Sequence, residues 1–150
     1  MSRSAPARVL ARGWCALSAL HGRIETHIER ALEAGHDLSV REFLMMTLSE
    51  QHDGPGGHLR IHRVADSVVL SQSATTHLVT RLEERGLLAR YLCPDDRRGI
   101  YTNVTPDGLA LLAQARPTHD SALREALQNA AKIPELAPLV TAVETLVPSA

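Results

Sequence analysis

The sequence predicts a mainly α-helical fold of the α+β class, on three observations. Both ends of the chain carry apolar residues at helical spacing. Aromatic residues make up only 3% of the 150 residues, so the core must rely on leucine, isoleucine, valine and alanine, which suits interlocked helices better than a β-sandwich. Between the ends, residues 71–108 predict a capped helix, a glycine stop, a strand, a turn, a second strand and a new helix. That order is typical of a winged helix.

The first predicted element is a long helix from about Ala5 to Ala34, which ends at a break over residues 35–38. One apolar stripe runs along it at helical spacing. The stripe consists of Leu10, Trp14, Leu17, Leu20 (or His21), Ile24, Ile28 and Leu32. Residues 1–24 carry four arginines and no acidic residue, a composition shared with organelle transit peptides. Because the stripe continues through this segment, we favour a helix of the folded protein over a removable presequence.

A second helix is predicted from Ser39, because the spacing of Ser39 and Glu42 makes a capping box. Its expected core side is apolar and consists of Phe43, Leu44, Met46 and Leu48. A glycine-rich loop follows over residues 52–57. Residues 59–68 then predict a short extended piece and a short helix, separated from the next helix by a tight turn.

The helix predicted over residues 72–85 begins at Ser71, whose hydroxyl can accept a backbone N–H of the first turn, and stops at Gly86. Its expected buried face is small and apolar, with Ala74, Leu78 and Leu82 stacked and Thr75 and Val79 beside them. Its expected outer face is polar and consists of Ser73, Thr76, His77, Thr80 and Glu84. Two short helices across a tight turn predict a helix-turn-helix, whose second helix reads a DNA major groove.

Two strands joined by a turn are predicted next. They cover residues 87–93, the turn 94–99 and residues 100–104. Thr105 caps the following helix, which we expect to bend or break at Pro117 before it resumes. A last helix is predicted over residues 134–146.

These elements predict DNA contacts from the helix. We expect Ser71 and Ser73 to hold phosphates. Gln72, Thr76 and His77 are placed to reach base edges, and glutamine favours adenine. An ordinary exposed helix face is the alternative, and the adjacent wing makes DNA contact the better interpretation.

The tip of the turn carries Arg97 and Arg98, and we expect at least one of them to enter the DNA minor groove. Asp95 or Asp96 is expected to brace the other arginine. A solvated basic turn with the same aspartate pairing is the alternative. For Arg81, near the predicted buried edge, an internal ion pair and a phosphate contact both stay open.

Net charge alone does not indicate a nucleic-acid binder, since it is −1. The distribution is more informative, because residues 54–101 carry seven basic and five acidic side chains. The remaining chain has nine basic and twelve acidic residues. Positive charge is therefore concentrated in the predicted winged helix.

The chain resembles the MarR family of bacterial winged helix-turn-helix transcriptional regulators. The similarity covers roughly residues 38–112. It rests on residues 71–86, the Leu-Glu-Glu-Arg-Gly-Leu-Leu run at 82–88, Asp96-Arg97-Arg98, and Val104-Thr105-Pro106-Asp107-Gly108. Cys93 stands where many members carry an aspartate, and Gln72 and His77 stand where they often carry arginine. The operator sequence is therefore not implied by the resemblance.

The resemblance implies a DNA-binding repressor that acts on a palindromic operator as a homodimer. The alanine- and leucine-rich ends agree with this, because a second copy would cover helix faces that one chain leaves open. We therefore predict one domain with a winged helix-turn-helix DNA-binding lobe over residues 38–112. Residues 1–36 and 113–150 are the predicted dimerisation segments.

Members of this family bind small acids and phenols between the dimer helices and the DNA-reading lobe. The resemblance thus implies a pocket for a small aromatic or anionic effector, for which we name Trp14, His21, Phe43 and, as a charge partner, Arg41. A dimer or core anchor is the alternative role of Trp14.

Neither a metal site nor a cofactor is predicted. His58 and His62 have i, i+4 spacing and His52 is near, but they lie around a glycine-rich loop without an evident acidic or thiolate partner. Cys15 lies where peroxide-sensing members keep a reactive cysteine. Those members support it with tyrosines in the N-terminal helices, whereas both tyrosines here fall in the wing, so we favour a packed, inert thiol.

Other classes of function fit less well. The chain has no nucleophile elbow, phosphate loop or dinucleotide fingerprint, so we do not expect an enzyme. Two cysteines are too few for a disulfide scaffold and no apolar run can span a bilayer, which favours the cytoplasm and no membrane partner. A helical ligand-sensor or protein-interaction module without specific DNA binding is the main alternative, and a non-specific architectural DNA binder is another.

Overall fold

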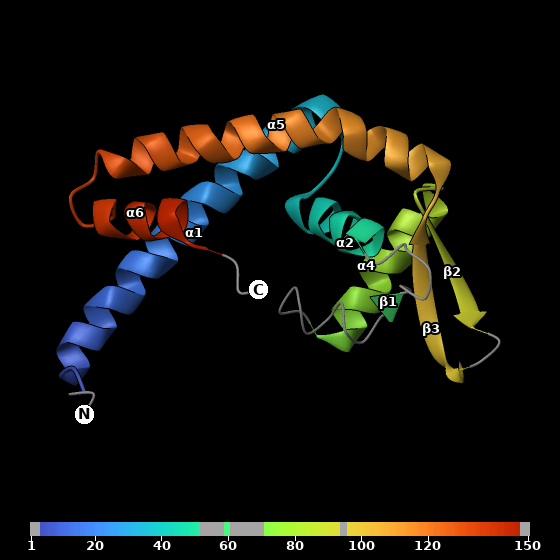
Figure 1. Ribbon diagram of the computed structural model, residues 1–150, viewed down its shortest axis with the longest axis horizontal. Helices are drawn as coiled ribbons and strands as arrows, with labels where there is room; N and C mark the ends of the chain where they lie inside the picture. Colours follow the sequence, from blue (N-terminus) through green and yellow to red (C-terminus); the bar gives the residue numbers. More distant parts are fainter. Residues whose placement is uncertain (1–3, 52–58, 61–70, 94–95, 148–150) are drawn as a thin grey trace. The chain divides into compact units, whose positions relative to one another are not determined.

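A computed structural model describes residues 4–51, 59–60, 71–93 and 96–147 of the chain (Figure 1). The described part is mostly helical with one small antiparallel sheet, as the sequence predicts. Its elements follow in the order α1 (Ala7–His36), α2 (Val40–Gln51), β1 (Leu59–Arg60), α4 (Gln72–Glu84), β2 (Leu88–Cys93), β3 (Asp96–Val104), α5 (Pro106–Ala131) and α6 (Ala137–Thr145). The short helix expected before residue 69 lies outside the described residues. Within the described ranges, no helix is long and apolar enough to cross a bilayer.

The chain divides into two compact units. The winged unit comprises Leu32–Pro117, and the helical unit comprises Met1–Ala31 together with Thr118–Ala150. Both divisions fall inside a helix, the first within α1 and the second within α5.

In the winged unit, the sheet has the strand order β1-β3-β2 and all its pairs are antiparallel. Helix α2 contacts β3, and α4 contacts β2. The Ser49 and Thr102 hydroxyls are hydrogen-bonded at 3.1 Å in the buried contact between α2 and β3. The fully or nearly buried apolar side chains of this unit are Leu32, Leu38, Phe43, Met45, Met46, Val79, Leu82, Leu87, Leu88, Val104, Leu112 and Ala115.

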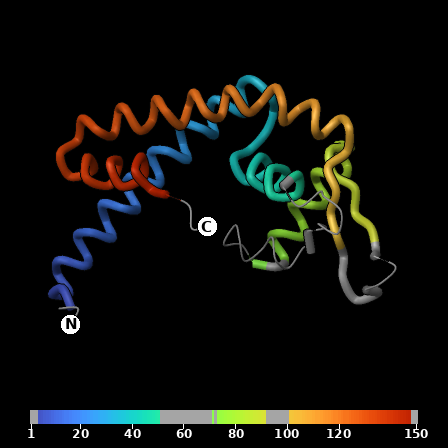
Figure 2. Tube along the Cα trace, viewed as in Figure 1, coloured from blue at the N-terminus to red at the C-terminus, as the bar shows by residue number. Residues whose placement is uncertain are grey.

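In the helical unit, α6 lies beside α1, as both ribbon and trace show (Figures 1 and 2). Four of its buried side chains form one apolar cluster. They are Leu20 of α1, Ala130 of α5, Leu136 before α6 and Val140 of α6. Alanines at the buried positions of α5 leave room for the neighbouring helices to pack closely.

Two helix ends differ from the sequence expectation. Helix α1 begins at Ala7 and continues to His36, and the residue in the left-handed conformation is Asp37, with φ 50°. Aspartate tolerates this conformation better than most side chains, so the helix does not end at Gly35. Helix α6 begins only at Ala137, because the preceding residues form a turn in which the Ile133 carbonyl accepts from the Leu136 N–H at 2.9 Å.

Helix α5 is also longer than expected, since it passes through Pro117 without interruption. Proline removes one backbone hydrogen bond from a helix. Pro117 is exposed, so water can satisfy the carbonyl that loses its partner. The loss of one bond in a helix of 26 residues does not end it.

On α2, the predicted core side is partly wrong. Phe43 and Met46 are buried, but Leu44 is 38% exposed and Met45 is fully buried in its place. Adjacent apolar residues in a helix lie about 100° apart, so four in a row cannot share one face, and the sequence does not say which of the four points outward.

Candidate nucleic-acid interface

Helix α4 begins as predicted at Ser71. The Ser71 backbone is extended, with φ −64° and ψ 154°, and its Oγ accepts from the Ala74 N–H at 3.1 Å. Its hydroxyl proton remains a donor after this bond is made. The exposed Ser71 side chain thus fixes the start of the helix and can still donate to a phosphate.

The buried face of α4 is rotated by one residue from the prediction. Thr75, Val79 and Leu82 are fully buried, whereas Ala74 is exposed and Leu78 is half-buried. Burial of Thr75 is possible because its hydroxyl donates to the Ser71 carbonyl at 3.0 Å, which satisfies its polar group locally.

The outer face of α4 is confirmed as polar. Ser73, Thr76, His77 and Thr80 together line one shallow, open hollow. All but Thr80 are exposed, so three of the four polar side chains are accessible. The Gln72 side chain lies outside the described residues. This arrangement offers hydroxyl and imidazole groups from successive turns to one ligand surface, which is the geometry needed to read base edges.

Arg90 of β2 completes this face, and the sequence analysis missed it. Its guanidinium donates to Thr80 Oγ1 at 2.7 Å, and its Nε lies 3.8 Å from the Glu83 carboxylate. The Thr80 hydroxyl in turn donates to the Thr76 carbonyl at 2.9 Å. A strand residue therefore fixes one wall of the hollow, and the only sequence signal was a basic residue within a mainly apolar strand.

The wing consists of β2 and β3, and its turn is shorter than predicted. Strand β3 already begins at Asp96, which pairs with Cys93. The next pair is Leu92 with Ile100, so residues 97–99 fall between these two pairs and the ladder is irregular there. The backbone of Arg97 and Arg98 is thus strand rather than turn. The side chains of both arginines and of Asp96, and all of Asp95, lie outside the described residues, so their predicted DNA and bracing roles stay predictions.

The base of the wing is tied to the helices on either side. Gly86 has φ +74°, which lets the chain leave α4 and enter β2. The Thr105 hydroxyl donates to the Gly86 carbonyl at 2.6 Å and accepts from the Gly108 N–H at 3.0 Å, so it caps α5 as predicted. A Cβ at Gly108 would overlap the Leu87 carbonyl, which shows how closely α5 approaches the strand.

Comparison with known proteins finds similarity to one family. The model of the MarR family matches residues 39–100, which begin at the cap of α2 and end in the wing. The transcriptional regulator MhqR of Bacillus subtilis is 28% identical over 109 residues, which cover 73% of this chain and 72% of MhqR.

The similarity to solved structures extends over a greater part of the chain. Sco3205, a MarR family regulator from Streptomyces coelicolor solved in complex with DNA, is 26% identical with a TM-score of 0.70, and the match covers 99% of this chain and 94% of Sco3205. CouR from Rhodococcus jostii, solved with p-coumaroyl-CoA, is 26% identical with a TM-score of 0.66 over 89% of this chain and 92% of CouR. Residues 39–100 thus match the MarR family model, and the fold over nearly the whole chain is similar to that of a MarR family regulator.

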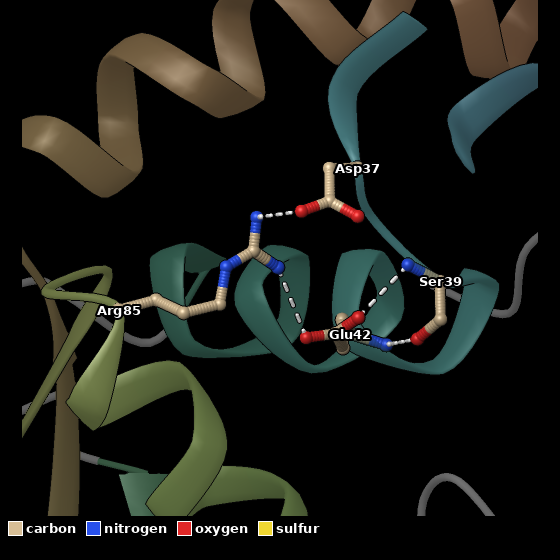
Figure 3. Close-up of polar contacts among 4 residues, drawn as sticks. All are labelled: Asp37, Ser39, Glu42 and Arg85. Atoms are coloured by element: carbon tan, nitrogen blue, oxygen red, sulfur yellow. Dashed lines mark hydrogen bonds and ion pairs between the residues drawn. The ribbon is translucent and has the colours of Figure 1, made fainter. Parts of the chain in front are cut away.

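The end of α4 is held by a second network that the sequence did not predict (Figure 3). The Arg85 guanidinium donates to a Glu42 carboxylate oxygen at 3.2 Å and lies 3.9 Å from the Asp37 carboxylate. Glu42 is only 3% exposed. Its other carboxylate oxygen accepts from the Ser39 N–H at 3.0 Å, while Ser39 Oγ accepts from the Glu42 N–H at the same distance.

The capping box at the start of α2 is therefore confirmed, and its glutamate also holds the last turn of α4. The sequence separates Glu42 and Arg85 by 43 positions, so periodicity and capping signals cannot reveal the pair. Arg81, for which an ion pair and a phosphate contact were both open, is exposed. Among the described residues no ion pair of Arg81 is found.

The predicted effector residues fall in different units of this chain. Trp14 is 67% exposed on α1. His21, also on α1, has its Nε2 3.4 Å from a Glu25 carboxylate oxygen. Arg41 and Phe43 lie on α2 in the winged unit, Arg41 exposed and Phe43 buried. A shared pocket for these four residues stays a prediction.

The expected packed state of Cys15 is wrong, and the metal alternative is not tested. Cys15 is exposed and is not part of a disulfide, whereas the sequence predicted a packed thiol. The described ranges hold no group of three or more histidine, cysteine or acidic side chains able to bind a metal. His52, His58 and His62 lie outside those ranges.

Proposed function

We propose that this chain is a sequence-specific regulator of transcription that binds a palindromic operator as a homodimer and represses the adjacent gene. The observation that carries the proposal is the outer face of α4, where Ser73, Thr76 and His77 surround one accessible hollow that Arg90 stabilises from the wing. Sco3205, which is similar in fold over nearly the whole chain, was solved in complex with DNA, and this supports DNA binding by the present chain.

Homodimerisation is supported by the surface of the helical unit. Large apolar side chains of α1 and of the end of the chain are exposed there, although each helix also contributes to a core. They are Val9, Leu10, Trp14, Leu17, Val143, Leu146 and Val147. A surface of this kind marks an association site. A second copy related by two-fold symmetry would bury it and place two copies of α4 against two half-sites.

Release by a small molecule is part of the proposal. The complex of CouR with p-coumaroyl-CoA supports a ligand-responsive regulator, because that protein has the same fold at similar identity. A ligand can release DNA only if it binds better to the form that does not bind DNA.

A mobility-shift titration tests the DNA-binding proposal, using duplexes from a random-sequence selection with the full chain. We expect a selected palindrome to bind more tightly than a scrambled duplex, with affinity that falls steeply as salt increases. Replacing Thr76 or His77 with alanine should cost about 1–3 kcal/mol at one base position of each half-site, if that side chain makes a good base contact. Thr141→Ala is the matched control, because Thr141 is an exposed helical threonine of the helical unit.

The wing provides a second arm of the same experiment. Arg97→Ala combined with Arg98→Ala should weaken binding to every duplex, and most strongly to those with A·T-rich flanks. If no selected or natural duplex binds, the repressor proposal is wrong and the helical sensor module without specific DNA binding becomes the better interpretation.

A further inference from the structure

A hollow of about 530 Å³ opens on the helical unit between the middle of α1 and residues 126–130 of α5. This volume lies within the range of about 300–1,000 Å³ that is common for small-ligand sites. Neither Trp14 nor His21 lines it. It is therefore distinct from the pocket that the sequence predicts and from the hollow on α4.

One wall of the hollow carries positive charge. Arg23, His27 and Arg30 are spaced by four and three residues on α1, so they lie on one face of the helix. His27 Nε2 lies 3.4 Å from the Glu125 carboxylate. Across the described residues, by contrast, no ion pair forms with Arg23 or Arg30. Two guanidinium groups thus line one hollow without a carboxylate of their own.

The floor of the hollow is apolar and open. Ala126 and Ala130 of α5 are 5% and 1% exposed, and they face the hollow together with Gly22. A Cβ placed on Gly22 would meet nothing within 4 Å, so there is free space directly above this residue. Ser18, Thr26 and Asn129 add uncharged hydrogen-bonding groups to the lining. An apolar floor with a few convergent polar groups is the usual form of a small-molecule site.

We propose that this hollow binds a small organic anion, whose carboxylate lies against Arg23 and Arg30 and whose apolar part lies on Gly22, Ala126 and Ala130. Arginine suits this role because its planar guanidinium can donate two parallel hydrogen bonds to one carboxylate. Binding itself does not depend on DNA. A regulatory role of the bound anion rests on the proposed function. If the anion changes the affinity for DNA, then DNA must change the affinity for the anion by the same factor.

The test compares an aromatic acid with its neutral isostere on the full chain. Titration of 2-naphthoate and 2-naphthamide is followed by calorimetry and by the backbone amide resonance of Gly22. We expect 2-naphthoate to shift that resonance to saturation, and 2-naphthamide to bind at least about tenfold more weakly, because it lacks the charge. This comparison needs no variant, so a folding defect cannot obscure it.

Two double variants then locate the charge. Arg23→Gln with Arg30→Gln should lower the affinity for 2-naphthoate at least about tenfold. Arg8→Gln with Arg12→Gln removes the same charge from an exposed part of α1 outside the hollow, and should change the affinity less than about twofold. Mobility shifts of each variant without 2-naphthoate measure DNA binding separately, so a failure of the DNA-binding proposal is distinguished from a failure of the anion site.

Three results would overturn the proposal. Equal binding of the acid and the amide would show that charge is not recognised. Equal losses in the two double variants would reduce the effect to the overall charge of α1. Absence of a Gly22 shift, together with a smaller oligomer for the Arg23→Gln, Arg30→Gln variant in light scattering, would show that a second copy of the chain occupies the hollow.

Discussion

The two units of this chain reach stability in different ways. The winged unit pairs several buried polar groups within itself, among them Glu42 with Arg85 and Ser49 with Thr102, around a core of large apolar side chains. The helical unit has an alanine-rich core and leaves Trp14 and Leu146 67% and 81% exposed. We therefore propose that the winged unit is complete in one chain, whereas a second copy covers the exposed apolar surface of the helical unit.

The largest expected effect comes from the exposed surface of the helical unit. Leu17→Asp combined with Val143→Asp places charge on two side chains that are 48% and 46% exposed, and we expect a monomer in light scattering. Affinity for a two-half-site operator should fall about 10²- to 10⁴-fold, because the second half-site is no longer bound by a linked copy.

The same variant tests whether the winged unit stays folded when the oligomer is lost. Hydrogen exchange at the Leu82 and Thr102 amides should stay slow, since both residues belong to the core of the winged unit. Leu109→Asp is the matched control, because Leu109 is 40% exposed in the winged unit and should leave the oligomer unchanged. Loss of protection at Leu82 and Thr102 would contradict the view that the winged unit is complete in one chain.

A smaller effect is expected inside the winged unit. Arg85→Ala leaves the buried Glu42 carboxylate without its cation, and we expect the free energy of unfolding to fall by about 2 kcal/mol in urea denaturation. The value is below that of a fully buried pair because the Arg85 side chain is 30% exposed, and solvent screens it. Arg81→Ala, on the exposed side of the same helix, should change stability by less than about 0.5 kcal/mol. Equal losses for the two variants would remove the pair as the cause.

The smallest expected effect compares two serines at the start of α4, one that contributes to stability and one that contributes to DNA affinity. Ser71→Ala removes the cap of α4 and should cost about 1 kcal/mol of stability. Ser73→Ala, two positions along, should cost less than about 0.5 kcal/mol of stability, because Ser73 lies on the exposed outer face. It should instead weaken binding to the selected duplex in the mobility-shift assay. A stability loss at Ser73 as large as at Ser71 would contradict this assignment of the two serines.

Local signals in the sequence predicted the framework of the winged unit. The cap at Ser71, the glycine stop at Gly86 and the capping box of Ser39 and Glu42 each depend on residues within a few positions of one another. Such contacts form wherever the helix forms, so the pattern of residue types is enough to identify them.

The contacts that sequence reasoning missed join distant segments. Arg90 reaches Thr80 from a strand, and Arg85 reaches Glu42 across 43 positions. Helical periodicity gives the relative angle of side chains but not the absolute rotation of a helix in its site, which is why α4 and α2 were each misjudged by one residue. Only the packing partner fixes that rotation.

The double use of Glu42 has a consequence for the history of this sequence. Glutamine at position 42 would keep an oxygen for the Ser39 N–H but would remove the anion opposite Arg85. A neutral side chain at position 85 would leave the carboxylate without a cation in a buried place. Either change alone is costly, whereas both together restore a neutral, satisfied contact. Positions 42 and 85 should therefore covary among the relatives of this chain, while Ser39 is retained with either residue at position 42.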